Sequence, residues 1–261
     1  MRSLHRPTAP DGLRRRATWG AALAFAAVLS APSVARADWE IWMPVEVRVP
    51  VLRAPSPTLG RVDLRLISEA RFSGRNEGLE QLFFRIGPAV YLTPFMFVAA
   101  HVSYSADALG GPTPIRMEEE IRAELEPNFF GRLGVFTLAS RNRLEYRWRQ
   151  TFQRLRFRTQ LRVNVAPRGW RVMPFLQGEA LFDLTDTRRD DPATAASAPP
   201  APQLGQLRGF AGAGLQLTSN VRLDVGFLMR LRQIGGASPG TFDNTLDEGL
   251  WMQLFVDIPP T

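Results

Sequence analysis

The residues of this chain that could do chemistry are mostly arginines and carboxylates spaced two positions apart. In the segment 154–165 the even positions are polar and include Arg154, Arg156, Arg158 and Arg162, whereas the odd positions are almost all apolar. A period of two predicts an extended strand with one polar and one apolar face. Four guanidinium groups on one face could bind carboxylates or conduct anions, but they do not suit an apolar core.

A second group that could do chemistry combines a histidine, a serine and nearby carboxylates. His101 is the only histidine after the first 37 residues, it shares a predicted strand face with Ser103, and the acidic run 118–120 follows on the next predicted strand. Such groups can act as base, nucleophile and orienting carboxylate in a hydrolase. A lone histidine in a strand is more often structural, so we expect no catalytic residues and keep His101 and Ser103 only as an enzyme alternative.

The composition excludes several other kinds of site. The chain has no cysteine, which rules out a disulfide framework and a thiolate metal site. The acidic run 118–120 could bind calcium, but a solvated strand face has the same composition. A phosphate-binding glycine loop and a nucleophile elbow are both absent from the sequence. We therefore expect no metal, no cofactor and no enzymatic activity.

The first 37 residues have the composition of a secretory signal peptide. Three arginines at 14–16 precede an apolar run at 19–29, and Ala35 and Ala37 occupy the two positions that a signal peptidase recognises. The apolar run is shorter than the roughly 20 residues that a membrane-spanning helix needs. We expect cleavage after Ala37, which would leave one domain at 38–261.

Removing this segment changes the charge balance. The full chain has 32 basic and 25 acidic residues and a formal net charge of +7. The first 37 residues contain six of the arginines and one of the acids, which leaves 26 basic and 24 acidic residues. A nearly neutral chain lacks the one-sided basic surface of a nucleic-acid binder. We therefore expect no nucleic-acid partner.

The alternation seen in 154–165 recurs along the chain. Eleven segments show it, at 39–52, 62–72, 82–91, 97–104, 115–125, 133–148, 154–165, 172–184, 207–217, 221–231 and 250–258. Most are about as long as a tilted strand that crosses a bilayer. In 82–91 and 97–104 both faces are largely apolar, so the sequence does not show which face points into the barrel. Because bacterial membrane barrels normally have an even strand number, we predict 10 to 12 antiparallel strands, with one merged or missed near the amino terminus.

The predicted connections differ in length at the two ends of such a barrel. Short turns are expected at 92–94, 127–131, 167–169 and 218–220, and longer loops at 105–113, 185–205 and 235–244. Outer-membrane barrels have this asymmetry, with short periplasmic turns and longer outer loops. The pattern favours an up-and-down transmembrane β-barrel.

The charged face of each strand is predicted to point into the lumen. An arginine on the lipid side at mid-membrane would cost about 2–4 kcal/mol. In a narrow lumen arginines and carboxylates must pair, because an unpaired buried charge is more costly still. The predicted lumen lining or salt-bridge network consists of Arg65, Glu69, Arg71, Glu118, Glu120, Arg122, Arg143, Glu145, Arg147, Arg154, Arg156, Arg158, Arg162, Glu179, Asp183, Arg222, Asp224 and Arg230.

Short motifs in this charge ladder resemble an uncharacterised family of bacterial outer-membrane β-barrels, domain of unknown function 2490. They are EIR at 120–122, RNRLEYR at 141–147, RLRFR at 154–158 and EALF at 179–182. The resemblance implies a Gram-negative outer-membrane barrel that contacts outer-membrane lipid, with no assigned activity. Insertion would then use the barrel-assembly machinery. The chain departs from membrane barrels in ending on Pro-Pro-Thr instead of an aromatic residue.

Three functions stay open at this stage. The first is an outer-membrane barrel with an Arg-rich lumen, acting structurally or as a passive, porin-like pore for small anions or polar solutes. The second is a soluble periplasmic lipocalin-like barrel, which would turn the same alternation inside out. The third is a lipid-modifying enzyme, because His101 and Ser103 are similar to residues of the lipid A deacylase barrels, whose catalytic groups lie on the lipid-facing exterior. Aromatic residues expected near strand ends favour the first, as interfacial girdles do: Tyr146, Trp148, Phe182, Phe210 and Trp251.

Overall fold

The computed structural model describes residues 39–52, 60–73, 78–109, 116–150, 152–188, 203–232 and 247–259. The predicted signal peptide lies outside these residues. They form eleven strands, which are β1 Trp39–Leu52, β2 Val62–Ser73, β3 Gly78–Thr93, β4 Met96–Leu109, β5 Arg116–Leu133, β6 Phe136–Arg149, β7 Phe152–Val165, β8 Val172–Arg188, β9 Gln203–Gln216, β10 Val221–Arg232 and β11 Asp247–Asp257. In the described part of the chain, no helix is long and apolar enough to cross a membrane.

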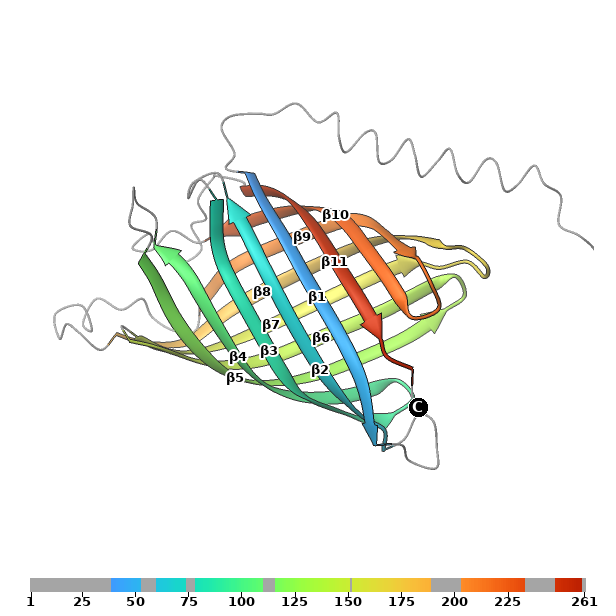
Figure 1. Cartoon of the computed structure of the whole chain (residues 1–261), viewed down its shortest axis with the longest axis horizontal. Coiled ribbons are helices and arrows are strands. Elements are labelled where there is room, and N and C mark those ends of the chain that lie inside the picture. Colours follow the sequence, from blue (N-terminus) through green and yellow to red (C-terminus); the bar gives the residue numbers. More distant parts are fainter. Residues whose placement is uncertain are drawn as a thin grey trace, which may run out of the picture. The chain divides into compact units, whose positions relative to one another are not determined.

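The strands close into a single barrel in which each strand pairs with its neighbours in sequence (Figure 1). These sequential pairs are antiparallel. The barrel is closed by β1, blue in Figure 1, which lies beside β11, in red. Because the strand number is odd, β1 and β11 run in the same direction and this closing pair is parallel.

The eleven segments found by alternation are confirmed, since each overlaps one strand. The eleven strands fall within the predicted range of 10 to 12. The expected even number is wrong, and so is a wholly antiparallel barrel. The closing pair skips Pro44, since pairing passes from Trp42–Trp251 to Val45–Leu254. Proline has no backbone N–H to donate. A parallel pair interrupted at one proline still satisfies most backbone groups on two strands that would otherwise be open edges.

The predicted turn at 127–131 is also wrong, because β5 continues to Leu133 and turns at Gly134 and Val135. Pro127 pairs with Val98 of β4, whereas the pairing with β6 skips Glu126 and Pro127. The missing N–H of Pro127 therefore falls at an interruption of the β6 ladder and does not end the strand. Gly134 has a φ of 60°, a conformation that favours glycine.

The two ends of the barrel are distinguished by their connections. At the short-turn end the strands are joined by residues 53–61, 94–95, 134–135, 166–171 and 217–220. At the opposite end, called the long-connection end, the joining residues are 74–77, 110–115, 150–151, 189–202 and 233–246. The asymmetry predicted from the sequence is present in part. The longest connections, 189–202 and 233–246, lie at the long-connection end, but 74–77 and 150–151 at that end are short and 53–61 at the short-turn end is long.

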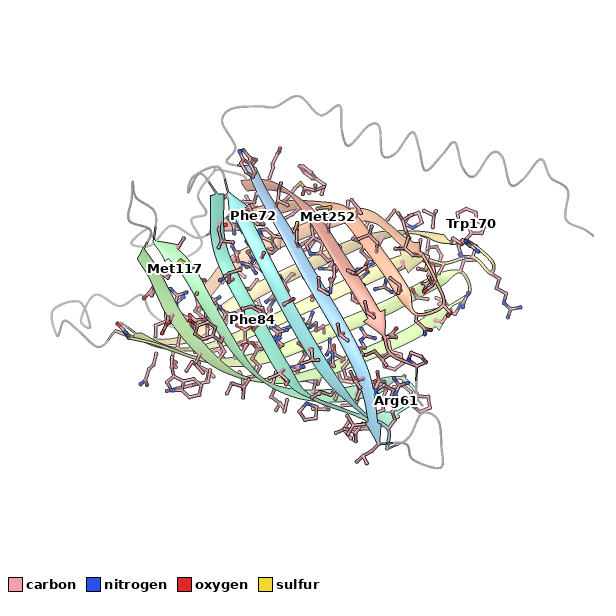
Figure 2. The ribbon with its side chains drawn as sticks, viewed as in Figure 1. Arg61, Phe72, Phe84, Met117, Trp170 and Met252 are labelled. Carbon is pink, nitrogen blue, oxygen red and sulfur yellow. The ribbon has the colours of Figure 1, made fainter. Side chains whose placement is uncertain are left out.

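Apolar side chains occupy most outward positions around the barrel wall. Phe84 on β3, Val102 on β4, Leu161 on β7 and Leu176 on β8 are 53%, 59%, 56% and 67% exposed. Figure 2 shows side chains projecting from the ribbon wall, with Met117 near the long-connection end and Trp170 at the short-turn end. Charged side chains are instead buried on the inward positions of the same strands, as the burial of Arg85 and Glu179 illustrates.

Candidate functional site

The interior of the barrel holds the charged residues of the strands. The structure places all eighteen predicted lumen residues on inward positions, and each takes part in at least one ion pair. Strand alternation explains this gathering, because residues two apart point to the same side of the wall. The charged interior expected from the sequence is therefore confirmed.

One chain of ion pairs starts on β1 and crosses the lumen to β6. Glu46 on β1 lies 2.8 Å from a guanidinium nitrogen of Arg65 on β2. A second nitrogen of Arg65 lies 3.0 Å from Glu126 on β5. Glu126 also accepts 2.7 Å hydrogen bonds from Arg141 and Arg143 on β6. Since β3 and β4 separate β2 from β5 in the wall, the Arg65–Glu126 contact passes through the interior.

The same chain continues from β6 to β9. Arg143 lies 3.1 Å from Glu145, and Glu145 lies 3.7 Å from Arg158 on β7. Arg158 donates a 2.9 Å hydrogen bond to Glu179 on β8, and Glu179 also pairs at 3.1 Å with Arg208 on β9. Adjacent strands thus alternate donors and acceptors at one level of the barrel.

The chain returns to β1 through an aromatic ring. The guanidinium carbon of Arg208 lies 4.9 Å from the ring centroid of Trp42, a distance suited to a cation–π contact. Trp42 is on β1, as is Glu46 at the start of the chain. The contacts therefore connect β1, β2 and β5 to β9 across the lumen. We call the participating charged residues the ion-pair belt: Glu46, Arg65, Glu126, Arg141, Arg143, Glu145, Arg158, Glu179 and Arg208.

A second cluster of charges lies nearer the long-connection end. We call it the upper cluster, and its members are Asp107, Glu118, Glu120, Arg122, Arg147 and Arg149. Three of these arginines converge on Glu120, whose side chain is fully buried. Arg149 also reaches carboxylates on β4 and β5. This cluster joins three strands above the belt.

Aromatic residues fill the interior beside β8 to β1. We call this group, which includes one leucine, the aromatic plug: Trp42, Phe175, Phe210, Trp251 and Leu228, each at most 5% exposed. Their rings contact one another, with centroid distances of 5.6 Å for Phe210–Trp251 and 5.7 Å for Phe175–Trp251. The prediction that Phe210 and Trp251 belong to an outer girdle is wrong. Both lie on the inward face of strands that carry few charges to mark that face.

Glycines on β9 and β10 make room for the plug. A Cβ atom on Gly212 would lie 2.9 Å from the ring of Phe175 and 2.2 Å from the carbonyl oxygen of Val225. A Cβ atom on Gly226 would lie 3.2 Å from the same ring. Larger residues at these positions would displace the ring or the neighbouring strand.

A cavity of about 770 Å³ occupies the half of the lumen nearer the short turns. Its lining extends from Phe95 and Phe130 beside those turns to Trp42 and Trp251 of the aromatic plug. Eleven arginines line it, whereas its lining includes only two carboxylates, those of Glu46 and Glu69. The lining arginines are Arg48, Arg65, Arg71, Arg85, Arg122, Arg132, Arg141, Arg143, Arg158, Arg162 and Arg222.

His101 and Ser103 face the lumen and do not form a hydrolase relay. The Ser103 hydroxyl donates a 2.6 Å hydrogen bond to Glu124, and neither ring nitrogen of His101 has a hydrogen-bond partner among the described residues. Both side chains are buried. In the lipid A deacylases the catalytic groups lie on the lipid-facing exterior. His101 and Ser103 lie on the opposite side of the barrel wall.

The same histidine belongs to the one group of possible metal ligands found in the described residues. His101, Glu124 and Glu126 offer ligand atoms within 4.8 Å of one another. Arg85 lies 2.9 Å from Glu124, and Glu126 already binds arginines of the ion-pair belt. A divalent cation would have to displace these guanidinium groups, so the geometry favours ion pairing over metal binding.

Several central residues were missed at the level of sequence. Glu126 was placed beyond the end of its strand, although the alternation of Glu120, Arg122 and Glu124 continues through it. Arg85 lies in the segment whose two faces were not distinguished. Arg208 lies on β9, whose sequence pattern is dominated by glycines and not by charged residues. If the strand had been extended past Pro127, Glu126 would have been included on its charged face.

Comparison with known proteins gives a family but no activity. No curated protein and no solved structure matches the chain. A family profile described as "Protein of unknown function (DUF2490)" matches residues 39–237, which is most of the chain and includes β1 to β10. The chain therefore belongs to the DUF2490 family.

Proposed function

We propose that this protein is a bacterial outer-membrane β-barrel with a closed interior, and that its role is structural. The observation that carries the proposal is the distribution of side chains across the wall. Arginines and carboxylates are buried inside, whereas large apolar side chains are exposed outside on strands all around the barrel. A soluble lipocalin-like barrel has the opposite distribution.

The exterior suits lipid because large apolar side chains are exposed on almost every strand. Monomeric soluble proteins rarely expose apolar patches larger than a few hundred Å². Here, in the part of the chain that the structure describes, exposed apolar side chains occur on all the strands except β9. Water would solvate such a surface poorly, whereas lipid acyl chains match it. Closure of the barrel leaves no open strand edge, as crossing a bilayer requires.

Aromatic residues mark two levels on this exterior. Trp39 and Trp148 are exposed near the long-connection end, and Phe136 and Trp170 are exposed near the short-turn end. Phe136 and Trp148 lie twelve positions apart on β6. At about 3.3 Å per residue and a tilt of about 45°, this separation is roughly 28 Å along the membrane normal. The value is close to the roughly 30 Å thickness of a bilayer core.

The interior supports a closed barrel over a passive pore. The Arg65–Glu126 ion pair crosses the lumen, the aromatic plug fills the side beside β8 to β1, and the upper cluster joins β4, β5 and β6. A solute would have to break buried ion pairs to pass. Each such break leaves a buried charge without its partner, which is strongly unfavourable.

Location and fold can be tested together. The mature chain should sediment with the outer membrane after export, contact its lipid and depend on the barrel-assembly machinery for insertion. On a gel, the unheated sample should run at a different position from the heated sample, as folded barrels do. Recovery as a soluble periplasmic protein without a heat-dependent shift would refute the proposal.

A further inference from the structure

We propose that the cavity near the short turns is a binding site for an amphipathic organic anion, a flat apolar body with a carboxylate, sulfonate or phosphate group. The closed barrel does not require this cavity of about 770 Å³. Its size falls within the range of about 300–1,000 Å³ that is typical of small-molecule sites. The inference rests on the proposed barrel and adds a ligand class to it.

The cavity presents cations because the carboxylates lie behind the arginines. The side chain of Arg141 is 25% exposed, whereas that of its partner Glu126 is fully buried. Arg222 is 32% exposed beside a fully buried Asp224. A solute in the cavity therefore meets guanidinium groups first, although Arg141 and Arg222 each have an acidic partner.

The arginines also offer more donors than their partners can accept. Glu126 is shared by Arg65, Arg141 and Arg143. Three guanidinium groups carry about fifteen N–H donors, whereas one carboxylate offers about four acceptor positions. Asp224 is similarly shared by Arg162 and Arg222. Donors remain for an anionic group that enters the cavity.

Aromatic faces in the same cavity suit the apolar part of the ligand. The guanidinium groups of Arg48 and Arg222 lie 5.9 and 4.0 Å from the ring centroid of Phe255. Trp42 and Trp251 line the other end of the cavity. Cationic and aromatic surfaces thus occur together, and this combination favours an anion with a flat apolar body over a small inorganic anion.

The lining also indicates from which end the ligand enters. Phe95, Phe130 and Arg132 are lining residues beside the short turns, and the aromatic plug ends the cavity at the opposite side. Short turns of outer-membrane barrels face the periplasm. The ligand would therefore come from the periplasm, and it would be held inside the barrel without passing through it.

Tryptophan fluorescence provides a direct test. The chain has six tryptophans, of which one lies in the predicted signal peptide. The substitutions W39F, W148F and W170F leave Trp42 and Trp251, both lining the cavity, as the only fluorophores of this kind in the mature protein. We would titrate this variant in detergent with naphthalene-1,5-disulfonate, with inorganic sulfate and with the cation trimethylanilinium.

The disulfonate should quench the two tryptophans saturably, and the other two probes should bind at least about ten-fold more weakly. R48Q and R222Q should each weaken disulfonate binding about ten-fold, since each removes a charged donor. Both partners keep another arginine, Arg65 for Glu46 and Arg162 for Asp224, so these variants should fold. The matched control R168Q changes an exposed arginine in a short turn at the same end and should bind normally.

The outcomes separate this site from the barrel itself. Saturable disulfonate binding that R48Q and R222Q weaken, and R168Q does not, supports the site. A variant with a normal heat-dependent gel shift but no saturable binding overturns the site and leaves the barrel intact. The site is also overturned if trimethylanilinium binds as tightly as the disulfonate, or if R168Q weakens disulfonate binding as much as R48Q and R222Q do. Loss of the gel shift in the parent protein would overturn the proposed function instead.

Discussion

Two walls of the same barrel fill its interior in different ways. The wall formed by β5, β6 and β7 presents arginines and carboxylates, including Glu126, Arg143 and Arg158. The wall formed by β9, β10 and β11 presents glycine and apolar residues, including Gly212, Leu228 and Trp251, beside charged residues such as Asp224 and Arg230. Long charged side chains of the first wall extend into the lumen. Glycines of the second wall leave space for aromatic rings from neighbouring strands.

The difference shows how one narrow lumen can be closed without a separate plug domain. Ion pairs fix distances between strands far apart in the wall, as the Arg65–Glu126 contact does. Close-packed rings exclude water from the opposite side, as Phe175 does over Gly212 and Gly226. Trp42 links the ion pairs to the packed rings, because it belongs to the aromatic plug and its ring stacks against the guanidinium group of Arg208.

The largest effect is expected at the charged wall, from E126Q. This change leaves Arg65, Arg141 and Arg143 without their shared carboxylate. Removing one partner of a buried ion pair typically costs 3–5 kcal/mol, and we expect about 5 kcal/mol here. Urea unfolding in lipid vesicles, followed by the heat-dependent gel shift, measures this loss. The control E119Q alters an exposed carboxylate and should change little; a stable E126Q protein would show that the belt is not needed for stability.

The next effect is expected at the apolar wall, from F175A. Removing a buried phenylalanine costs about 3–5 kcal/mol, and we expect about 4 kcal/mol because glycines cannot fill the space left by the ring. The same unfolding measurement applies. The adjacent Leu176 faces outward and is 67% exposed, so L176A should cost much less. Equal losses for both variants would contradict the inward packing of the ring.

A smaller effect tests the glycines themselves. G212A places a Cβ atom against Phe175 and the backbone of β10. Overpacking of this kind costs about 1–3 kcal/mol, and we expect about 2 kcal/mol of lost stability. On the same strand, a Cβ atom at Gly209 would make only an ordinary 3.6 Å contact with Met229. G209A should therefore fold normally, and a loss matching that of G212A would rule out a specific fit to the ring.

The smallest effect is expected from R158L. Glu179 keeps Arg208 and Glu145 keeps Arg143 when Arg158 is lost. We therefore expect a loss of about 1.5 kcal/mol, the value of one hydrogen bond to a charged group. Thermal unfolding compared with the wild type measures it. A loss as large as that of E126Q would mean that the belt carboxylates do not share their arginines as described.

Much of the barrel is visible in local sequence patterns. In a strand with arginines on even positions and apolar residues on odd positions, the sequence alone shows which face points inward. This is the case for β7. The eleven segments follow from such patterns because the period of two is a property of each strand alone. The predicted lumen residues come from the same strands, where the polar face is clear.

The remaining features depend on contacts that no single strand encodes. Phe210 and Trp251 could lie on either face, because their strands have few charges to distinguish inside from outside. The pairing of Arg65 with Glu126 joins residues far apart in sequence and separated by two strands in the wall. The parallel closure of β1 on β11 depends on the strand number being odd.

The most direct test of a closed interior is conductance in a planar lipid bilayer. The mature protein would be inserted after a heat-dependent gel shift has shown that it is folded. We predict no steady channel current, because the ion-pair belt, the upper cluster and the aromatic plug occupy the lumen. A steady, ohmic conductance from inserted wild-type protein would contradict this and would make the arginines of the interior an ion path.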